Sequence, residues 1–275
     1  MNRRLSRLFA AGTLAVVLLI CLFPFWWMLD VSLKQQVEIF SGRSLIPAHP
    51  TLENYTNLFA QYHMGAYLTN SVVVVGVSTL ASLFIGTPAA YSLSRFKLAG
   101  HLNTLGLVSV LLVRILPPIL MVVPFYLVLA KLGLLDTRLG LMLIYTGINT
   151  SFVIWMMQSF LAEIPGEIEE AALVDGDTRF SAMRRIMLPI AASGLAATAI
   201  FVVIVTYNDF LIALTMTSSP TAQTMPVGIS TLIGKNQVQW GPMAAGGIIG
   251  AVPIFIFTAI VQRHLVRGMT MGAVK

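Results

Sequence analysis

The sequence predicts an all-α integral membrane protein with six transmembrane helices and a cytoplasmic helix between the fourth and fifth. Three observations predict this fold class. Of the 275 residues, 57% are hydrophobic and 10% are charged, whereas a soluble domain has about 25% charged residues. The apolar residues form long blocks rather than stripes with a 3.6-residue period, as in membrane spans. Basic residues gather in alternate connections between the blocks.

Six blocks are long enough to cross a bilayer, because about 20 residues in a helix span its ~30 Å core. They cover residues 8–29, 71–94, 102–130, 139–162, 186–208 and 236–262. The first is interpreted as an uncleaved helix, since Trp26 and Trp27 stand where a signal peptide has small residues. The tandem proline Pro117-Pro118 is expected to break the third helix. A short surface helix is expected near residues 52–58.

Six spans place both termini on the same side of the membrane. That side then carries eleven basic residues: Arg3, Arg4, Arg7, Arg95, Lys97, Arg179, Arg184, Arg185, Arg263, Arg267 and Lys275. The other side carries five: Lys34, Arg43, Lys131, Arg138 and Lys235. The positive-inside rule assigns the first set, and with it both termini, to the cytoplasm. Residues 163–178 are therefore expected in the cytoplasm.

Residues 163–178 are charged, unlike the apolar blocks around them. Pro165 suits the start of a helix, and the glutamates that follow favour the positive end of its dipole. Gly176 suits its end, since glycine accepts the left-handed conformation. Asp177 or Thr178 can cap a second short helix. The segment is predicted to be a helix, a glycine corner and a second helix.

The first of these helices has an apolar face of small residues. Ile168, Ala171 and Ala172 share this face at helical spacing. One interpretation is an amphipathic helix that lies on lipid, but its acidic residues would be repelled by an anionic leaflet. The alanines permit close approach of another protein. Docking to a protein partner is therefore the favoured interpretation.

The sequence here resembles the EAA signature of bacterial ABC importer permeases. Glu170-Ala171-Ala172 is followed after three residues by Gly176, after nine more by Ile186, and then by Leu188-Pro189. The stretches 114–137, 207–214 and 269–275 and the pair Ile154-Trp155 are similar to the carbohydrate, maltose-type branch of that family. The resemblance covers most of the chain, and is weaker before residue 50.

The resemblance implies a single permease domain over residues 1–275, with the coupling-helix region at 163–178 in contact with a cytoplasmic ATPase. The ATPase-coupling residues are then Ile168, Glu170, Ala171, Ala172, Asp175 and Gly176. It also implies a heterodimer with a second permease subunit, two ATP-binding subunits and an extracytoplasmic solute-binding protein. The resemblance also implies that the chain lies in the lipid of the bacterial inner membrane.

The chain is not expected to be an enzyme. It has no G-x-x-x-x-G-K-[ST] phosphate loop, no Cys/His cluster with metal-ligand spacing and no paired carboxylate in an apolar setting. We expect no cofactor or metal in this chain, with ATP and Mg on the partner subunits. The net charge of +6 is scattered over the connections, which does not suggest nucleic acid.

Polar residues within or beside the spans are candidates for a substrate pathway. Arg114 lies inside the third span, where a charge is costly, and either faces a cavity or pairs structurally. Tyr207, Asn208 and Asp209 close the fifth span and combine a ring, an amide and a carboxylate, as sugar sites do. They can equally bond a neighbouring helix. The sugar itself is not predicted, nor is which permease subunit holds it.

Two alternatives to an importer subunit stay open at this point. A self-sufficient, ion-coupled secondary carrier would need an ion site in the membrane, for which Asp209 and Arg114 are the candidates. A membrane scaffold without transport would lack a water-accessible cavity. Copurification of a soluble ATPase would separate the importer from the carrier.

Overall fold

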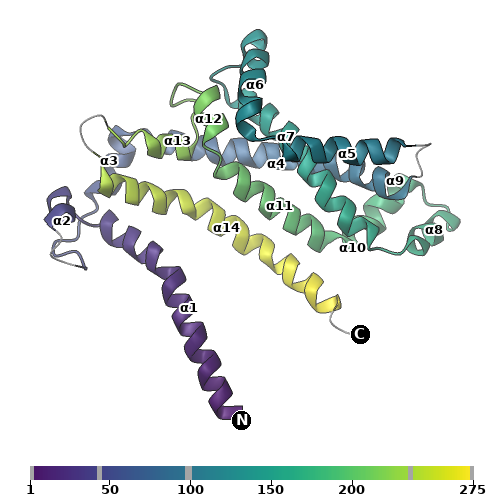
Figure 1. Ribbon diagram of the computed structural model, residues 1–275, viewed down its shortest axis with the longest axis horizontal. Coiled ribbons are helices and arrows are strands. Elements are labelled where there is room, and N and C mark those ends of the chain that lie inside the picture. Colours follow the sequence, from purple (N-terminus) through teal and green to yellow (C-terminus); the bar gives the residue numbers. More distant parts are fainter. Residues whose placement is uncertain (1–2, 42–44, 97–100, 235–237, 273–275) are drawn as a thin grey trace. The chain divides into compact units, whose positions relative to one another are not determined.

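The computed structural model describes residues 3–41, 45–96, 101–234 and 238–272. Lys97, Lys235, Lys275 and Arg43, which the topology prediction counts, lie outside these ranges. Within them the chain is helical, with one isolated β-bridge between Ile233 and Val238 (Figure 1). The helices are α1 (Arg3–Ser32), α2 (Gln36–Ser41), α3 (Glu53–Gln61), α4 (Met64–Arg95), α5 (Leu102–Ile115), α6 (Pro118–Leu132), α7 (Arg138–Ala162), α8 (Gly166–Val174), α9 (Arg179–Ala182), the π-helix η1 (Met183–Met187), α10 (Leu188–Ile190), α11 (Ala192–Tyr207), α12 (Leu211–Met216), α13 (Met225–Ser230) and α14 (Trp240–Gly272).

The predicted class of helical membrane protein is confirmed. Four stretches in α1, α4, α7 and α14 are each long and apolar enough to cross a membrane. Two further pairs qualify together but are bent: α5 with α6 by 98°, and the stretch Arg179–Ile190 with α11 by 78°. When each bent pair counts as one span, the chain has the six that the sequence predicts.

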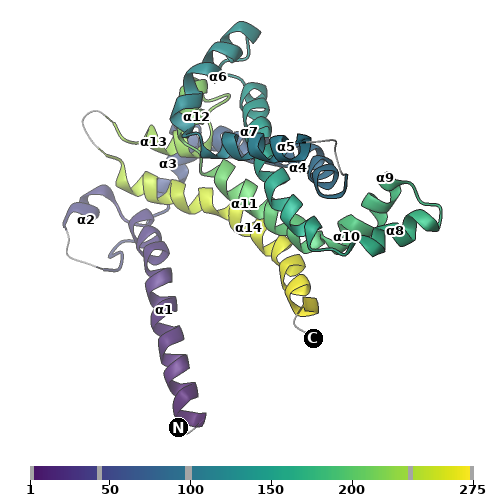
Figure 2. The ribbon, with the colours of Figure 1, turned by 45° about the vertical axis from the view of Figure 1, so that its right-hand side comes forward.

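Both bends occur at prolines or close to them. The tandem proline breaks the third span as predicted: α5 ends before Leu116, and α6 begins with Pro118 (Figure 2). The prediction for the fifth span was wrong at its start, because α11 begins at Ala192 and not at residue 186. Residues 186–190 are apolar and so extend the hydrophobic run, but they belong to η1 and α10 on the other side of the bend. The predicted surface helix exists as α3.

Internal contacts divide the chain into two units, one of residues 1–65 with 228–252 and one of residues 66–227 with 253–275. The expectation of a single domain over residues 1–275 stays a prediction. In the first unit, Lys34 and Asp30 form a buried ion pair of 2.5 Å between Nζ and Oδ2. The Asn54 amide donates to the carbonyls of Ser32 and Lys34, each at 2.8 Å. Gly241 packs against Asn54 so closely that a Cβ would lie 2.5 Å from its Oδ1.

The second unit is built around α7, which contacts α5, α11 and α12. Small residues permit the close approaches, as is usual between membrane helices. A Cβ on Gly86 of α4 would lie 2.7 Å from a Val153 methyl of α7, and one on Gly194 of α11 would overlap the Phe160 ring. A buried cluster joins α4, α7, η1 and α11: Ala90, Tyr91, Phe152, Val153, Met157, Leu161, Ile164, Met183, Met187, Ala191 and Val202. This core supports the helices that carry the candidate site.

Candidate functional site

Helix α8 begins and ends where the sequence predicts. Pro165 is the N-cap residue of α8. Gly176 lies just beyond the C-terminal end of the helix and has a φ of +93°, in the left-handed region. The Gly176 N–H donates to the Leu173 carbonyl at 3.2 Å, and the Asp177 N–H donates to the Ala172 carbonyl at 3.0 Å. This pair of bonds is the Schellman termination, which requires a residue that tolerates positive φ. Glycine is therefore needed at position 176 to turn the chain out of α8.

The second short helix follows from a side-chain cap. Thr178 accepts a hydrogen bond on Oγ1 from the Ser181 N–H at 3.2 Å and so starts α9. The chain then passes through η1, where Met183 and Met187 are buried in the cluster around α7. The predicted helix, glycine corner and second helix are confirmed in this region.

The two sides of α8 have different surroundings. Of the six residues predicted to contact an ATPase, five are exposed: Ile168, Glu170, Ala171, Asp175 and Gly176. Val174, which was not predicted, is 86% exposed. Ala172 is buried at 6% exposure and packs against its own chain. The prediction that Ala172 shares an exposed face with Ala171 was therefore wrong. The exposed side of α8 thus consists of small, acidic and apolar residues.

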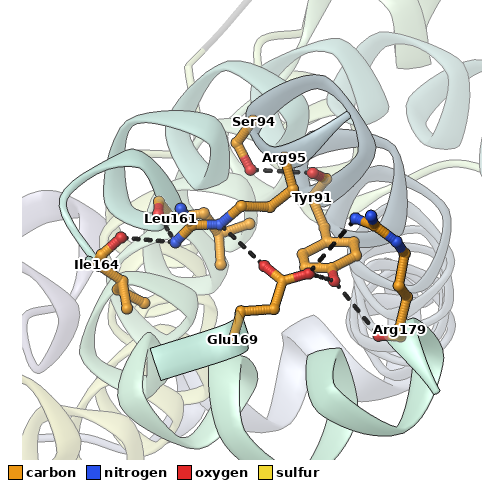
Figure 3. Close-up of polar contacts among 7 residues, drawn as sticks. All are labelled: Tyr91, Ser94, Arg95, Leu161, Ile164, Glu169 and Arg179. Atoms are coloured by element: carbon orange, nitrogen blue, oxygen red, sulfur yellow. Dashed lines mark hydrogen bonds and ion pairs between the residues drawn. The ribbon is translucent and has the colours of Figure 1, made fainter. Parts of the chain in front are cut away.

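The buried side of α8 carries a charged residue that the sequence analysis did not single out. Glu169 is only 4% exposed, and its Oε1 accepts a hydrogen bond from the Tyr91 hydroxyl of α4 (Figure 3). Its Oε2 lies 3.3 Å from Nε of Arg95, and its Oε1 lies 3.9 Å from Nη1 of Arg179. These four residues, Tyr91, Arg95, Glu169 and Arg179, are called the Glu169 cluster below.

Arg95 connects the Glu169 cluster to the end of α7. Its Nη2 donates to the carbonyls of Leu161 at 3.0 Å and Ile164 at 2.6 Å (Figure 3). The carbonyls at a helix end lack their usual partners in the helical ladder. The Leu161 carbonyl also accepts from the Ile164 N–H at 3.3 Å, and the guanidinium adds a second, charged donor there. A sequence signal did exist, because Tyr91 and Arg95 are four residues apart and share one face at the end of a span. The sequence did not indicate which of several nearby glutamates contacts these two residues, and in the structure it is Glu169.

Arg114 and Asp209 are brought together around one cavity in the second unit. This cavity measures about 160 Å³ and has a polar lining of Arg114, Tyr145, Asn149, Thr206 and Asp209 among apolar side chains. The Arg114 guanidinium stands over the Phe152 ring at 4.5 Å, a cation–π arrangement.

The polar groups around this cavity are held by hydrogen bonds. The Tyr145 hydroxyl donates to Asp209 Oδ1 at 2.8 Å. The same oxygen accepts from the backbone N–H groups of Ile212 at 3.0 Å and Ala213 at 3.4 Å, so Asp209 caps α12. Asn149 donates to Thr206 Oγ1 at 2.8 Å. Asn149 is a polar residue of a span whose expected role was to bond a neighbouring helix, as it does here. Tyr145 and Thr206 were not predicted, because they lie inside spans among apolar neighbours.

Tyr207 and Asn208 do not join this cavity. Tyr207 is buried and lines a different, apolar hollow of about 330 Å³ between α4, α11 and α14. Asn208 is exposed, and its amide donates to the Ile204 carbonyl of its own helix at 2.7 Å. The four predicted pathway residues therefore separate into one pair around the polar cavity and one pair outside it. Among the described residues, no group of three His, Cys, Asp or Glu side chains is placed to hold a metal.

Comparisons with known proteins agree with this architecture. Residues 82–271 match the family described as "Binding-protein-dependent transport system inner membrane component". The chain is 34% identical to the trehalose/maltose transport system permease protein MalG of Thermococcus litoralis, over 94% of this chain and 92% of that protein. It is 36% identical to the trehalose transport system permease protein SugB of Mycobacterium tuberculosis, over 92% of each chain.

A solved structure shows the same fold. A chain from the crystal structure of a bacterial ABC transporter involved in the import of alginate superposes with a TM-score of 0.80. At 20% identity, the match covers 96% of this chain and 98% of that one. The prediction of an ABC permease is confirmed, and the comparisons do not support a secondary carrier. The chain belongs to the family of binding-protein-dependent transport system inner membrane components.

Proposed function

We propose that the chain is the permease subunit of an ATP-driven importer that moves a carbohydrate or sugar-like solute across the bacterial inner membrane by alternating access. The relatives named for trehalose and maltose support the carbohydrate class. The complex contains a second permease, two ATP-binding subunits that carry ATP and Mg, and an extracytoplasmic solute-binding protein. Both termini and α8 face the cytoplasm.

The observation that carries this proposal is the division of α8 into two sides. Its buried side holds a charged residue in place, while its opposite side leaves Glu170, Ala171 and Val174 exposed. A lipid surface is a poor match, because an acidic helix is repelled by anionic headgroups. A cleft on an ATPase fits the small side chains, and closure of the ATPases then displaces α8 as a rigid element.

The cavity around Arg114 and Asp209 is the proposed substrate pathway in this subunit. Its polar groups provide hydrogen-bond donors and acceptors, and Tyr145 provides a ring, as sugar hydroxyls and sugar faces require. Its volume of about 160 Å³ is below the ~300–1,000 Å³ of most ligand sites. The second permease subunit is therefore proposed to complete the site, and Tyr207 and Asn208 are proposed to contact neighbouring helices.

A purification experiment tests the docking of α8. Two variants, Gly176→Val and Glu170→Lys, are expected to lose the ATP-binding subunits from the detergent-solubilised complex while the chain stays inserted in the membrane. Valine at position 176 cannot adopt the φ of +93° without strain, and lysine reverses the charge of an exposed contact.

The matched control is Gly166→Val at the other end of α8. A Cβ at position 166 meets only Nη1 of Arg95, at 3.9 Å, and needs no unusual backbone angle. This variant is expected to retain the ATP-binding subunits. A complex of normal composition from both Gly176→Val and Glu170→Lys would refute the docking of α8.

A further inference from the structure

We infer that Glu169 is a positioning residue that links α8 to the end of α4, so that a displacement of α8 moves α4 with it. The inference rests on the proposed function, in which α8 receives the motion of an ATPase. It assigns a mechanical role to the buried side of α8, whereas the proposed docking uses the exposed side.

The geometry of the Glu169 cluster supports this role. The carboxylate comes from α8, the Tyr91 hydroxyl and Arg95 guanidinium come from the last turns of α4, and Arg179 begins α9 (Figure 3). Glu169 and Arg95 have side chains that are 5% and 13% exposed. Since water is largely excluded, the attraction between them is weakly screened. The link is both charged and shielded from solvent.

Apart from the Glu169 cluster, α8 is joined to its neighbours by two short connections, and the chain turns in each of them. On one side, residues 163–165 connect it to α7, and on the other the Gly176 corner connects it to α9. The first connection also reaches α4, because the Ile164 carbonyl accepts a hydrogen bond from Arg95 at 2.6 Å. Glu169 adds a contact with α4 from within α8 itself. Arg95 forms an ion pair with Glu169 through Nε and donates to the carbonyls of Leu161 and Ile164 through Nη2. Glu169 therefore connects α8 to α4 directly, and to the end of α7 through Arg95.

The neighbouring glutamate provides a matched comparison. Glu169 and Glu170 are adjacent in sequence and have the same side chain, but Glu169 is buried and Glu170 is exposed. Glu169→Gln retains the size and hydrogen-bonding ability of the side chain and removes its charge. Glu170→Gln makes the same chemical change on the docking side.

The test measures the distance between α8 and α4 in the whole transporter complex. Spin labels are placed at Glu167→Cys, an exposed position of α8 outside the proposed docking residues, and at Phe84→Cys, which is 82% exposed, in a chain carrying Cys21→Ser. With Glu169 present, the distance distribution is expected to stay single and unchanged when ATP and vanadate are added. With Glu169→Gln it is expected to broaden and to shift on addition of ATP and vanadate. A residue that only stabilises the fold would not make this distance depend on the nucleotide.

Two further variants keep the test decisive. Glu170→Gln is expected to leave the distance unchanged and to reduce the ATPase retained in the complex. Tyr91→Phe, which removes one hydroxyl and keeps the ring, is expected to give a smaller shift than Glu169→Gln. If Glu169→Gln does not fold, Tyr91→Phe decides alone.

The outcomes separate the two proposals. Suppose that the complex is intact and that the distance in Glu169→Gln, or in Tyr91→Phe in its place, does not change with nucleotide. That result would contradict the link through Glu169 but not the docking of α8. Failure of the unsubstituted chain to retain any ATPase would overturn the proposed function, and the inference with it.

Discussion

Two carboxylates of the second unit each accept a hydrogen bond from a tyrosine of a spanning helix, yet the rest of their surroundings differ. Glu169 accepts from Tyr91 and lies beside the guanidinium groups of Arg95 and Arg179. Asp209 accepts from Tyr145 and otherwise from backbone N–H groups, and it lines a polar cavity.

The difference indicates two uses of a carboxylate in one helical unit. Positive side chains compensate Glu169 where water is scarce, so the residue suits a fixed connection between helices. Backbone N–H groups and the Tyr145 hydroxyl orient Asp209 at the wall of a cavity, so the residue suits contact with a solute. The comparison predicts that variants of the Glu169 cluster act first on stability, and that variants of Asp209 act first on transport.

The largest effect is expected for Arg95→Ala. Removing one partner of a buried ion pair leaves an uncompensated charge, which costs about 3–5 kcal/mol. The carbonyls of Leu161 and Ile164 also lose the bonds that Arg95 donates to them. Arg179 cannot substitute, because its side chain is 53% exposed and 3.9 Å away. Thermal and denaturant unfolding of the purified chain in detergent measures the loss.

Arg138→Ala is the control for this prediction. Arg138 is exposed and donates to the Thr221 carbonyl at 3.1 Å, and an exposed contact of this kind contributes about 1 kcal/mol or less. Equal stability of Arg95→Ala and Arg138→Ala would show that the Glu169 cluster is not a strong connection.

An intermediate effect is expected for Asp209, and two substitutions separate its roles. Asp209→Ala removes the cap of α12, at a cost of about 0.5–2 kcal/mol, and also removes the charge beside the cavity. Asp209→Asn keeps an acceptor for the Ile212 and Ala213 N–H groups and removes the charge alone. Two measurements distinguish these roles: unfolding of the chain, and uptake, into vesicles that hold the whole complex, of the radiolabelled solute that its solute-binding protein binds.

The expected result is lower uptake for both variants and lower stability for Asp209→Ala only. If Asp209→Asn transports as well as the unsubstituted chain, the charge has no part in transport. Asp209 then has the structural role that the sequence analysis kept as an alternative.

Features with a local cause were predictable from the sequence. The length of the apolar blocks gave the spans, and the conformational demands of glycine and proline gave the corner at Gly176 and the break at Pro117-Pro118. The acidic and small residues of the exposed side of α8 were also identified. Each of these features depends on residues within a few positions of one another.

Features that depend on contacts between distant helices were not predictable in the same way. Tyr91 and Glu169 are 78 positions apart, and the sequence alone does not indicate which of several glutamates turns inward. Asn208 and Asp209 are adjacent, but the end of α11 leaves one exposed and turns the other towards the cavity. The start of α11 was misplaced because an apolar run does not reveal a bend within it.

A third carboxylate, Asp136, tests backbone capping away from the Glu169 cluster and from the polar cavity around Asp209. It lies between α6 and α7 with a φ of +56°, and its Oδ1 accepts from the N–H groups of Ser218 at 2.8 Å and Ser219 at 2.9 Å. Burial alone would raise the pKa of this carboxyl, but the hydrogen bonds from Ser218 and Ser219 outweigh it and hold the pKa below its usual value.

The pH dependence follows from that lowered pKa. A carboxyl whose pKa is lower when folded contributes stability above its unfolded pKa of about 3.9, and loses that contribution as the pH falls through the folded pKa. Asp136→Asn, which tolerates positive φ, is expected to be slightly less stable at pH 6 and to lose less stability between pH 5 and 3. An amide oxygen accepts more weakly than a carboxylate, so hydrogen exchange at Ser218 and Ser219 should rise at pH 6. The bonds from the Asp136 N–H to the Met216 carbonyl, at 2.9 Å, and from Arg138 Nε to the Thr221 carbonyl, at 3.1 Å, are unaffected by the substitution. Identical unfolding curves for the two chains across this range would show that backbone capping of Asp136 adds no stability, and would weaken the same argument for Asp209.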